Sequence, residues 1–222
     1  MAKQYGILVD ITHCLGCGVC VAACKQENDL PPYADDKPGT TGTAWNQVLS
    51  FSEGIYPDLS VHYLHIHCMH CETPPCVAAC PKDAIYKREE GTVLITKAKC
   101  NGCQDQPDKI KKCVVACPYG AIQVNEAKDA VEACTLCIHR TESGLEPACV
   151  CACIGGALIF GDLDDPKSKI TEAIKAAKDR VFVLKPEENT GPSVRYICPE
   201  GVAIEKVSDT NAYEVLYGFR KQ

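Results

Sequence analysis

The chain has 222 residues, a formal net charge of −6 at pH 7 and 18 cysteines. The charge is mildly acidic and no basic block or aromatic-interleaved stripe is present, which disfavours nucleic-acid binding. No apolar run approaches the roughly 20 residues needed to span a bilayer. Cysteine is frequent enough that a scaffold built on cysteine has to be considered.

The N-terminus shows no signal peptide. Residues 1–10 contain no apolar core of the required length, and Asp10 and Thr12 interrupt the apolar residues around them. Disulfides need an oxidising compartment, which such a chain does not enter by itself. We therefore expect the cysteines to serve a purpose other than disulfide formation.

The first element is a strand at Tyr5–Asp10, followed by a run of cysteines that continues into a short helix ending near Glu27. Cys14 to Cys24 are spaced C-x2-C-x2-C-x3-C. In bacterial ferredoxins this run gives three thiolates to one cluster and its last cysteine to a second cluster. A single run cannot complete its own cluster, so further cysteines are required elsewhere in the chain.

Residues 28–60 are rich in turn-forming residues, and only Trp45 to Phe51 looks ordered. Long segments of this kind are usually functional, disordered or packed on another chain. We expect an insertion at residues 31–60 that faces a partner. A loop wrapped on its own domain, with Trp45 as a plug, is the alternative.

A strand at Val61–His67 with histidines on one face leads into a second cysteine run, spaced C-x2-C-x4-C-x3-C-P and ending at Pro81. The four cysteines of this run are complete without a histidine. His67 and His70 are therefore interpreted as hydrogen-bond donors near sulfur or as surface residues, rather than as ligands.

Two further groups follow the same rule. A strand, a glycine turn and a strand over residues 84–95 precede the third group, and the Ala-Ile strand pattern at 84–85 recurs at 121–122, which indicates an internal repeat. The fourth group precedes a strand at 157–160. All four groups read C-x2-C-xn-C-x3-C, with n of 2, 4, 9 and 11.

Beyond Gly161 the cysteine groups stop. Ser168 is a candidate N-cap for a helix that places Ile170, Ala173, Ile174 and Ala177 on one face. Strands are expected at 181–184 and 194–197. We interpret residues 162–222 as a cluster-free C-terminal clasp, a helix and a β-hairpin.

The spacing favours four 4Fe-4S clusters. Zinc sites use two separated cysteine pairs, whereas the x3 step turns the last cysteine of a run toward a second cluster. Groups two and three are neighbours in sequence and should exchange their last cysteines, and groups one and four should do the same. The expected ligands are Cys14, Cys17, Cys20 and Cys153 for cluster 1; Cys24, Cys134, Cys137 and Cys149 for cluster 2; Cys68, Cys71, Cys76 and Cys117 for cluster 3; and Cys80, Cys100, Cys103 and Cys113 for cluster 4.

This pairing predicts an α+β fold with one ferredoxin-like module nested inside another. The first module comprises residues 1–30 and 125–161, and the second comprises residues 61–124. Cys151 and Cys198 are left over and are expected to be buried non-ligands. A zinc scaffold remains the alternative to clusters, and it would be colourless.

The motifs resemble the four-cluster iron–sulfur subunits of the dimethyl sulfoxide reductase family of molybdenum and tungsten enzymes. The resemblance is carried by Val9-Asp10 before the first run, Cys68-Met69-His70-Cys71, Pro75-Cys76-Val77, Cys117-Pro118-Tyr119-Gly120, Cys134-Thr135-Leu136-Cys137, Pro147-Ala148-Cys149-Val150, Gly161 to Pro166, Leu184 to Glu187 and Gly191 to Tyr196. The chain departs from the family pattern in the nine residues between Cys103 and Cys113 and in the lack of proline after Cys24 and Cys153.

The resemblance implies an electron-transfer subunit that relays single electrons between a large molybdopterin catalytic subunit and a membrane quinone subunit or another carrier. Groups one and four would face the catalytic subunit. The chain itself contains no recognisable catalytic constellation. Family subunits without a signal are cytoplasmic or are exported folded with a signal-bearing partner. A free polyferredoxin carrier is the alternative function.

Overall fold

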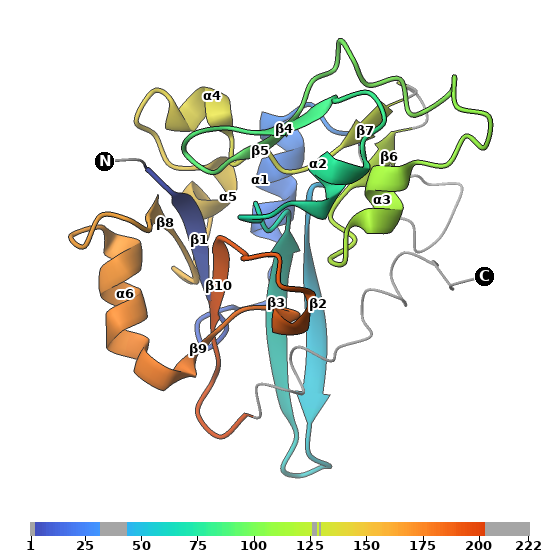
Figure 1. The fold of residues 1–222 in the computed structure, drawn as a ribbon. Coiled ribbons are helices and arrows are strands. Elements are labelled where there is room, and N and C mark those ends of the chain that lie inside the picture. Colours follow the sequence, from blue (N-terminus) through green and yellow to red (C-terminus); the bar gives the residue numbers. More distant parts are fainter. Residues whose placement is uncertain (1–2, 32–43, 126–127, 129, 203–222) are drawn as a thin grey trace.

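The computed structural model describes residues 3–31, 44–125, 128 and 130–202. Short helices and small sheets alternate along the chain, which confirms the predicted α+β class (Figure 1). The strands are β1 (Tyr5–Asp10), β2 (Asn46–Glu53), β3 (Ser60–His67), β4 (Ile85–Lys87), β5 (Val93–Ile95), β6 (Gln123–Asn125), β7 (Ala130–Glu132), β8 (Leu158–Asp162), β9 (Val181–Phe182) and β10 (Val194–Ile197). The helices are α1 (Val19–Glu27), α2 (Pro75–Ala79), α3 (Lys112–Ala116), α4 (Ile138–Thr141), α5 (Ala148–Cys151) and α6 (Lys169–Ala177), with 3-10 turns η2 (Lys178–Arg180) and η3 (Pro186–Glu188).

The largest sheet has the strand order β8-β1-β10-β9, and β1 is central in it. β1 runs antiparallel to β8 and parallel to β10. Ile7, Leu8 and Val9 are fully buried, because a central strand covered on both faces carries a continuous apolar run. Ile7 and Val9 enter the main core, whereas Leu8 on the other face packs in a cluster with Ile170 of α6.

The C-terminal segment contains the predicted helix and hairpin. β9 and β10 pair antiparallel, and α6 begins after Ser168 as expected. Ser168 itself makes no side-chain capping bond; the hydroxyl of Thr171 donates to the carbonyls of Ser168 and Asp165 instead. β10 also pairs with β1, so this segment completes the main sheet rather than forming an appended unit.

A long hairpin of β2 and β3 extends away from this sheet (Figure 1). The register runs from Asn46 opposite His67 to Glu53 opposite Ser60, and Ile55 and Tyr56 are exposed at the turn. The domain boundary predicted after residue 60 therefore falls within the hairpin, at the start of β3. Residues 32–43 of the predicted insertion lie outside the described residues.

The outer part of the molecule is made of two small hairpins, β4–β5 and β6–β7, with the short helices α2 and α3 beside them (Figure 1). Its core holds Ile85, Val93, Ile122 and Val131 together with cysteine side chains. Among the described residues, no helix has the length and apolar character needed to cross a membrane.

The segment before β10 fastens onto the loop of the second cysteine group. Backbone N–H groups of Glu72 and Thr73 donate to the carbonyls of Gly191 and Thr190, at 2.7 and 3.0 Å. The hydroxyl of Ser193 donates to the carbonyl of His70 at 2.8 Å. Gly191 has φ of +62°, and a Cβ there would collide with Glu72, so glycine is required at this contact.

Candidate functional site

The first predicted quartet surrounds one cavity. Its lining includes Cys14, Cys17 and Cys20 from the loop before α1 and the start of α1, and Cys153 from the turn after α5. Burial, followed by the charges of neighbouring thiols, raises the pKa of Cys20 to about 12. Cys17 is exposed, so this cavity lies close to the protein surface.

The second predicted quartet also surrounds one cavity. Cys24 comes from the last part of α1, and Cys134, Cys137 and Cys149 come from the segment leading into α4 and from α5. Burial raises the pKa of Cys24 to about 12, although the amide of Asn28, whose Nδ2 lies 3.6 Å from Cys24 Sγ, acts in the opposite direction. Trp45 lines the same cavity.

A third cavity has the fourth predicted quartet on its wall. The lining includes Cys80, Cys100, Cys103 and Cys113, which converge from the end of α2, the segment after β5 and the start of α3. Each of the three cavities has a predicted quartet of cysteines on its wall, which fits the same kind of group in each.

The remaining quartet, Cys68, Cys71, Cys76 and Cys117, is also close together, because the charges of its members act on one another's pKa. Burial, and after it the charges of Cys117, Cys76 and Cys71, raises the pKa of Cys68 well above its ordinary value. Burial also raises the pKa of Cys117, but backbone N–H groups of residues 119–122 hydrogen-bond its sulfur and oppose that rise. These N–H groups favour a thiolate at Cys117.

Thiols of consecutive quartets are neighbours. Burial and closer thiols raise the pKa values of Cys149, Cys134 and Cys76 most, but a thiol of a neighbouring quartet also contributes to each. The charge of Cys20 raises the pKa of Cys149, that of Cys68 raises the pKa of Cys134, and that of Cys113 raises the pKa of Cys76. These pairs join the first predicted quartet to the second, the second to the third, and the third to the fourth. The four groups therefore form a continuous series rather than separate sites.

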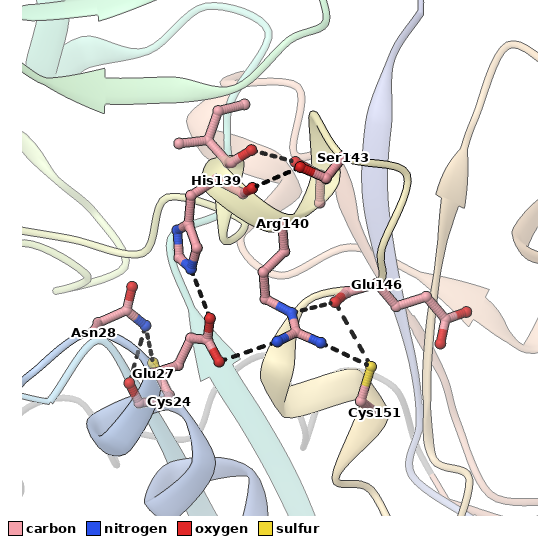
Figure 2. A network of polar contacts seen from close by, with 10 residues as sticks. Cys24, Glu27, Asn28, His139, Arg140, Ser143, Glu146 and Cys151 are labelled. Atoms are coloured by element: carbon pink, nitrogen blue, oxygen red, sulfur yellow. Dashed lines mark hydrogen bonds and ion pairs between the residues drawn. The ribbon is translucent and has the colours of Figure 1, made fainter.

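A polar network ties α1 to the segment carrying Cys137 and Cys149 (Figure 2). The carboxylate of Glu27 in α1 contacts His139 Nε2 at 2.7 Å and accepts from Arg140 at 3.1 Å. Arg140 also donates to the carbonyl of Glu146 at 2.9 Å. The network holds together two segments that are more than a hundred residues apart in sequence and that line the same cavity. The cysteine spacing gave no sign of it.

His65 and His67 of β3 and His70 in the following loop are buried, which corrects the suggestion that His67 and His70 are surface residues. His70 accepts a hydrogen bond from the backbone N–H of Val93 at 3.0 Å. His67 lines the second cavity and His65, which the sequence interpretation did not single out, lines the first. The alternation of residues along β3 could have identified His65, because it shares a face with His67.

The two leftover cysteines differ from each other. Cys198 is 2% exposed, as expected, and its thiol lies 3.3 Å from the carbonyl of Val202. Cys151 is exposed, which corrects its expected burial, and lies beside Arg140 at 3.7 Å (Figure 2). Its position follows from α5, since Cys149 turns inward to the cavity and a residue two further along a helix faces elsewhere.

The donor sets fit iron–sulfur clusters. Each consists of four sulfurs, and burial raises the pKa of most of these thiols above their ordinary value, so thiolates need a cation to stabilise them. Backbone N–H groups of Ala84 and Leu136 lie 3.3 and 3.4 Å from the sulfurs of Cys80 and Cys134. Among the described side chains, no group of three is arranged to hold a lone metal ion.

Comparison with known proteins supports the same interpretation. A family model described as a 4Fe-4S dicluster domain matches residues 59–163. The chain is 39% identical to a tetrathionate reductase subunit of Salmonella typhimurium, over 87% of this chain and 72% of that protein. It is 34% identical to the arsenate respiratory reductase iron-sulfur subunit of Shewanella sp. strain ANA-3, over 90% and 98% of the two chains.

One chain of the anaerobic dimethyl sulfoxide reductase of Escherichia coli is 35% identical over 87% of this chain and 94% of its own length. These relatives are matched along most of their length, so the similarity is not confined to the cysteine motifs. The chain belongs to the family of 4Fe-4S electron-transfer subunits of the dimethyl sulfoxide reductase family of molybdopterin oxidoreductases.

Proposed function

We propose that this chain carries four 4Fe-4S clusters, one in each predicted quartet, and relays single electrons between a large molybdenum or tungsten catalytic subunit and a second partner. That partner is a membrane quinone subunit or a soluble carrier. The proposed ligands are Cys14, Cys17, Cys20 and Cys153; Cys24, Cys134, Cys137 and Cys149; Cys68, Cys71, Cys76 and Cys117; and Cys80, Cys100, Cys103 and Cys113.

The observation that carries the proposal is the series of neighbouring quartets. Three pairs of thiols from consecutive quartets are close enough for their charges to interact: Cys20 with Cys149, Cys68 with Cys134, and Cys113 with Cys76. A 4Fe-4S cluster supplies one-electron transfer at a potential set by charge, hydrogen bonds to sulfur and solvent exposure. A series of such sites with two ends suits a relay between two partners better than a store of electrons.

Both ends of the series carry exposed apolar side chains. Leu15 and Ile154, next to Cys14 and Cys153, are 62% and 70% exposed. Val115, in α3 between Cys113 and Cys117, is 78% exposed. Exposed apolar groups beside a site are typical of interaction surfaces. We assign the first end to the catalytic subunit and the outer end to the second partner.

The nested arrangement of modules is part of the proposal. The first module comprises residues 1–30 and 125–161, and the bonds that the carboxylate of Glu27 accepts from His139 and Arg140 support the joining of its two segments. The second comprises residues 61–124. Residues 31–60 form the partner-facing insertion and residues 162–222 the clasp. Its attachment is supported by the backbone N–H groups of Glu72 and Thr73, which donate to the clasp carbonyls of Gly191 and Thr190.

Metal and sulfide analysis of the anaerobically purified chain tests the number and kind of clusters. We expect about 16 irons and about 16 acid-labile sulfides per chain, four of each per cluster, with EPR signals of several interacting 4Fe-4S centres after reduction. A colourless protein with stoichiometric zinc and no sulfide would overturn the proposal in favour of the zinc scaffold. Half the expected iron would mean that the chain carries two clusters rather than four.

Purification from the native cell tests the partner. A tagged chain should bring down a much larger subunit that contains molybdenum or tungsten. Ile154→Glu should abolish this association, whereas Val115→Glu at the opposite end should preserve it, because Ile154 lies beside the first quartet and Val115 does not. A chain isolated alone, with full iron, would favour the free polyferredoxin carrier.

A further inference from the structure

A pair of buried histidines lies on one face of β3. His65 and His67 are 1% and 2% exposed, and their ring centroids are 5.0 Å apart with an interplanar angle of 48°. Residues two apart on a strand share a face, so both rings project to the same side of the hairpin. Neither ring nitrogen of either histidine has a hydrogen-bond partner among the described residues.

Each histidine belongs to a different cavity. His65 lines the cavity with Cys14, Cys17, Cys20 and Cys153 on its wall, and His67 lines the cavity of Cys24, Cys134, Cys137 and Cys149. Because the two rings are close enough to contact each other, His65 and His67 together span the wall between the two cavities. The indole Nε1 of Trp45, also buried without a partner among the described residues, belongs to the same cavity as His67.

Buried polar groups without partners are uncommon in folded proteins, since an unpaired buried donor loses its bonds to water without replacement. Two adjacent histidines with four unpaired ring nitrogens therefore indicate a ligand that these groups contact. A neutral imidazole has one N–H, and a protonated imidazole has two. At least one donor per ring is present at any pH.

We propose that His65 donates a ring N–H to sulfur of the cluster in the first cavity, and His67 donates one to sulfur of the cluster in the second. The two rings thereby set the reduction potentials of two adjacent clusters from one strand. This inference rests on the proposed function, which supplies the clusters. It assigns to His65 and His67 a role in tuning potentials rather than in ligation.

The direction of the effect follows from charge. Reduction adds negative charge to a cluster, so an N–H that points at its sulfur stabilises the reduced form more than the oxidised form. Loss of one donor should lower the midpoint potential. We expect a change of about tenfold in the reduction equilibrium, which is about 59 mV for one electron.

The test is an EPR-monitored redox titration of the complete complex with His65→Leu, His67→Leu and the control His62→Leu. Each of the first two variants should lower the potential of one cluster, and the two variants should affect different clusters. His62 lies on the opposite face of β3, where it contacts Phe51, and its variant should leave all potentials unchanged. Unchanged potentials in both test variants, or an equal shift in all three variants, would overturn the inference.

A second measurement decides the matter if a variant loses iron. In the unaltered complex with ¹⁵N-labelled histidine, pulsed EPR of the reduced clusters should detect weak coupling to histidine nitrogen. His65→Gln and His67→Gln, which retain an N–H donor, should restore part of the potential that leucine removes. Absence of nitrogen coupling would refute the contact. Absence of 4Fe-4S signals altogether would instead refute the proposed function, so the two failures are distinguishable.

Discussion

The part of the molecule around the four-stranded sheet and the outer part around β4–β5 and β6–β7 are stabilised differently. The sheet side has a core with large buried side chains, among them Leu64, Tyr119, Leu136 and Tyr196. The outer core has four branched apolar residues and Ala133, and the rest of its buried members are cysteines. A small apolar core rarely suffices for independent stability.

In the outer part, the cluster should stabilise the fold as well as carry electrons. On the sheet side, β1 and α6 would retain apolar contacts without iron, whereas the outer hairpins would lose the centre on which they pack. The cavities also differ in polarity. Histidines line the first two cavities, but the residues that line the outer cavity include no histidine. The potential of the outer cluster should therefore not depend on a histidine donor.

The largest expected effect is the loss of an outer ligand. Cys113→Ser should reduce iron from about 16 to about 12 per chain, because one cluster of four irons is lost. Hydrogen exchange should rise in β4, β5 and β6, while β1 and β10 stay protected. Iron analysis and exchange mass spectrometry under anaerobic conditions measure both effects.

Cys151→Ser is the matched control for this variant. Cys151 is exposed on α5 and is absent from the walls of the three cavities described above, so its replacement should leave iron content and exchange unchanged. Uniform loss of protection in Cys113→Ser, extending to β1, would show that the two parts do not differ in their dependence on iron. Iron loss in Cys151→Ser would make this cysteine a ligand.

The sheet side should instead respond to a change in apolar packing. Ile170→Ala removes a fully buried side chain that packs against Leu8 on the face covered by α6. We expect a loss of about 2–5 kcal/mol in the free energy of unfolding, measured by anaerobic denaturation. The EPR spectrum in native buffer should be unchanged. A simultaneous loss of clusters would contradict the separation of the two parts.

The sequence allowed a large part of the chemistry to be predicted. The ferredoxin spacing predicts four quartets, because ligand positions depend on local turns and short helices that the motif itself encodes. Strand Tyr5–Asp10, the β4–β5 hairpin and the helix after Ser168 were predicted correctly, since each depends on local periodicity. The ligand assignments themselves stay predictions until iron is measured.

Other features depend on contacts between distant segments and were not visible in the sequence. Parallel pairing of β10 with β1 joins residues that are almost two hundred positions apart, and nothing local in either strand specifies its neighbour. The same is true of the contact between Glu27 and Arg140. Burial of His67 and His70 was missed because a histidine-rich strand can face either water or the interior.

The clasp should have an intermediate effect, because it joins the sheet side to the second cysteine group through a few hydrogen bonds. The hydroxyls of Tyr119 and Thr190 are 2.6 Å apart and buried. Tyr119→Phe removes this bond and should lower the free energy of unfolding by about 1 kcal/mol, measured by anaerobic denaturation. Tyr5→Phe, at a less buried position, is the control and should change it less. An equal effect of the two variants would mean that the clasp bond contributes nothing.

The smallest expected effect concerns Glu27, which joins the two segments of the first module near the surface. A hydrogen bond from His139, followed by the charge of Arg140, lowers the pKa of this carboxyl below its ordinary value of 4.5. The folded protein therefore favours the carboxylate. The resulting stabilisation is complete above pH 4.5 and is lost as the pH falls through the lowered pKa. Glu27→Gln cannot titrate and should be less stable than the unaltered protein at about pH 6 but equally stable in acid.

Anaerobic urea denaturation of both proteins between about pH 6 and about pH 3.5 measures this difference, and the cluster absorbance at each pH shows where the comparison is valid. Salt should reduce the difference, because the pair is partly exposed and its charges are screened. If the difference in stability between Glu27→Gln and the unaltered protein stayed constant with pH, the amide would disturb packing rather than an ion pair. In that case the two segments of the first module are held by the cysteines of the second cavity and by apolar contacts, and the sheet side would depend on its cluster as the outer part does.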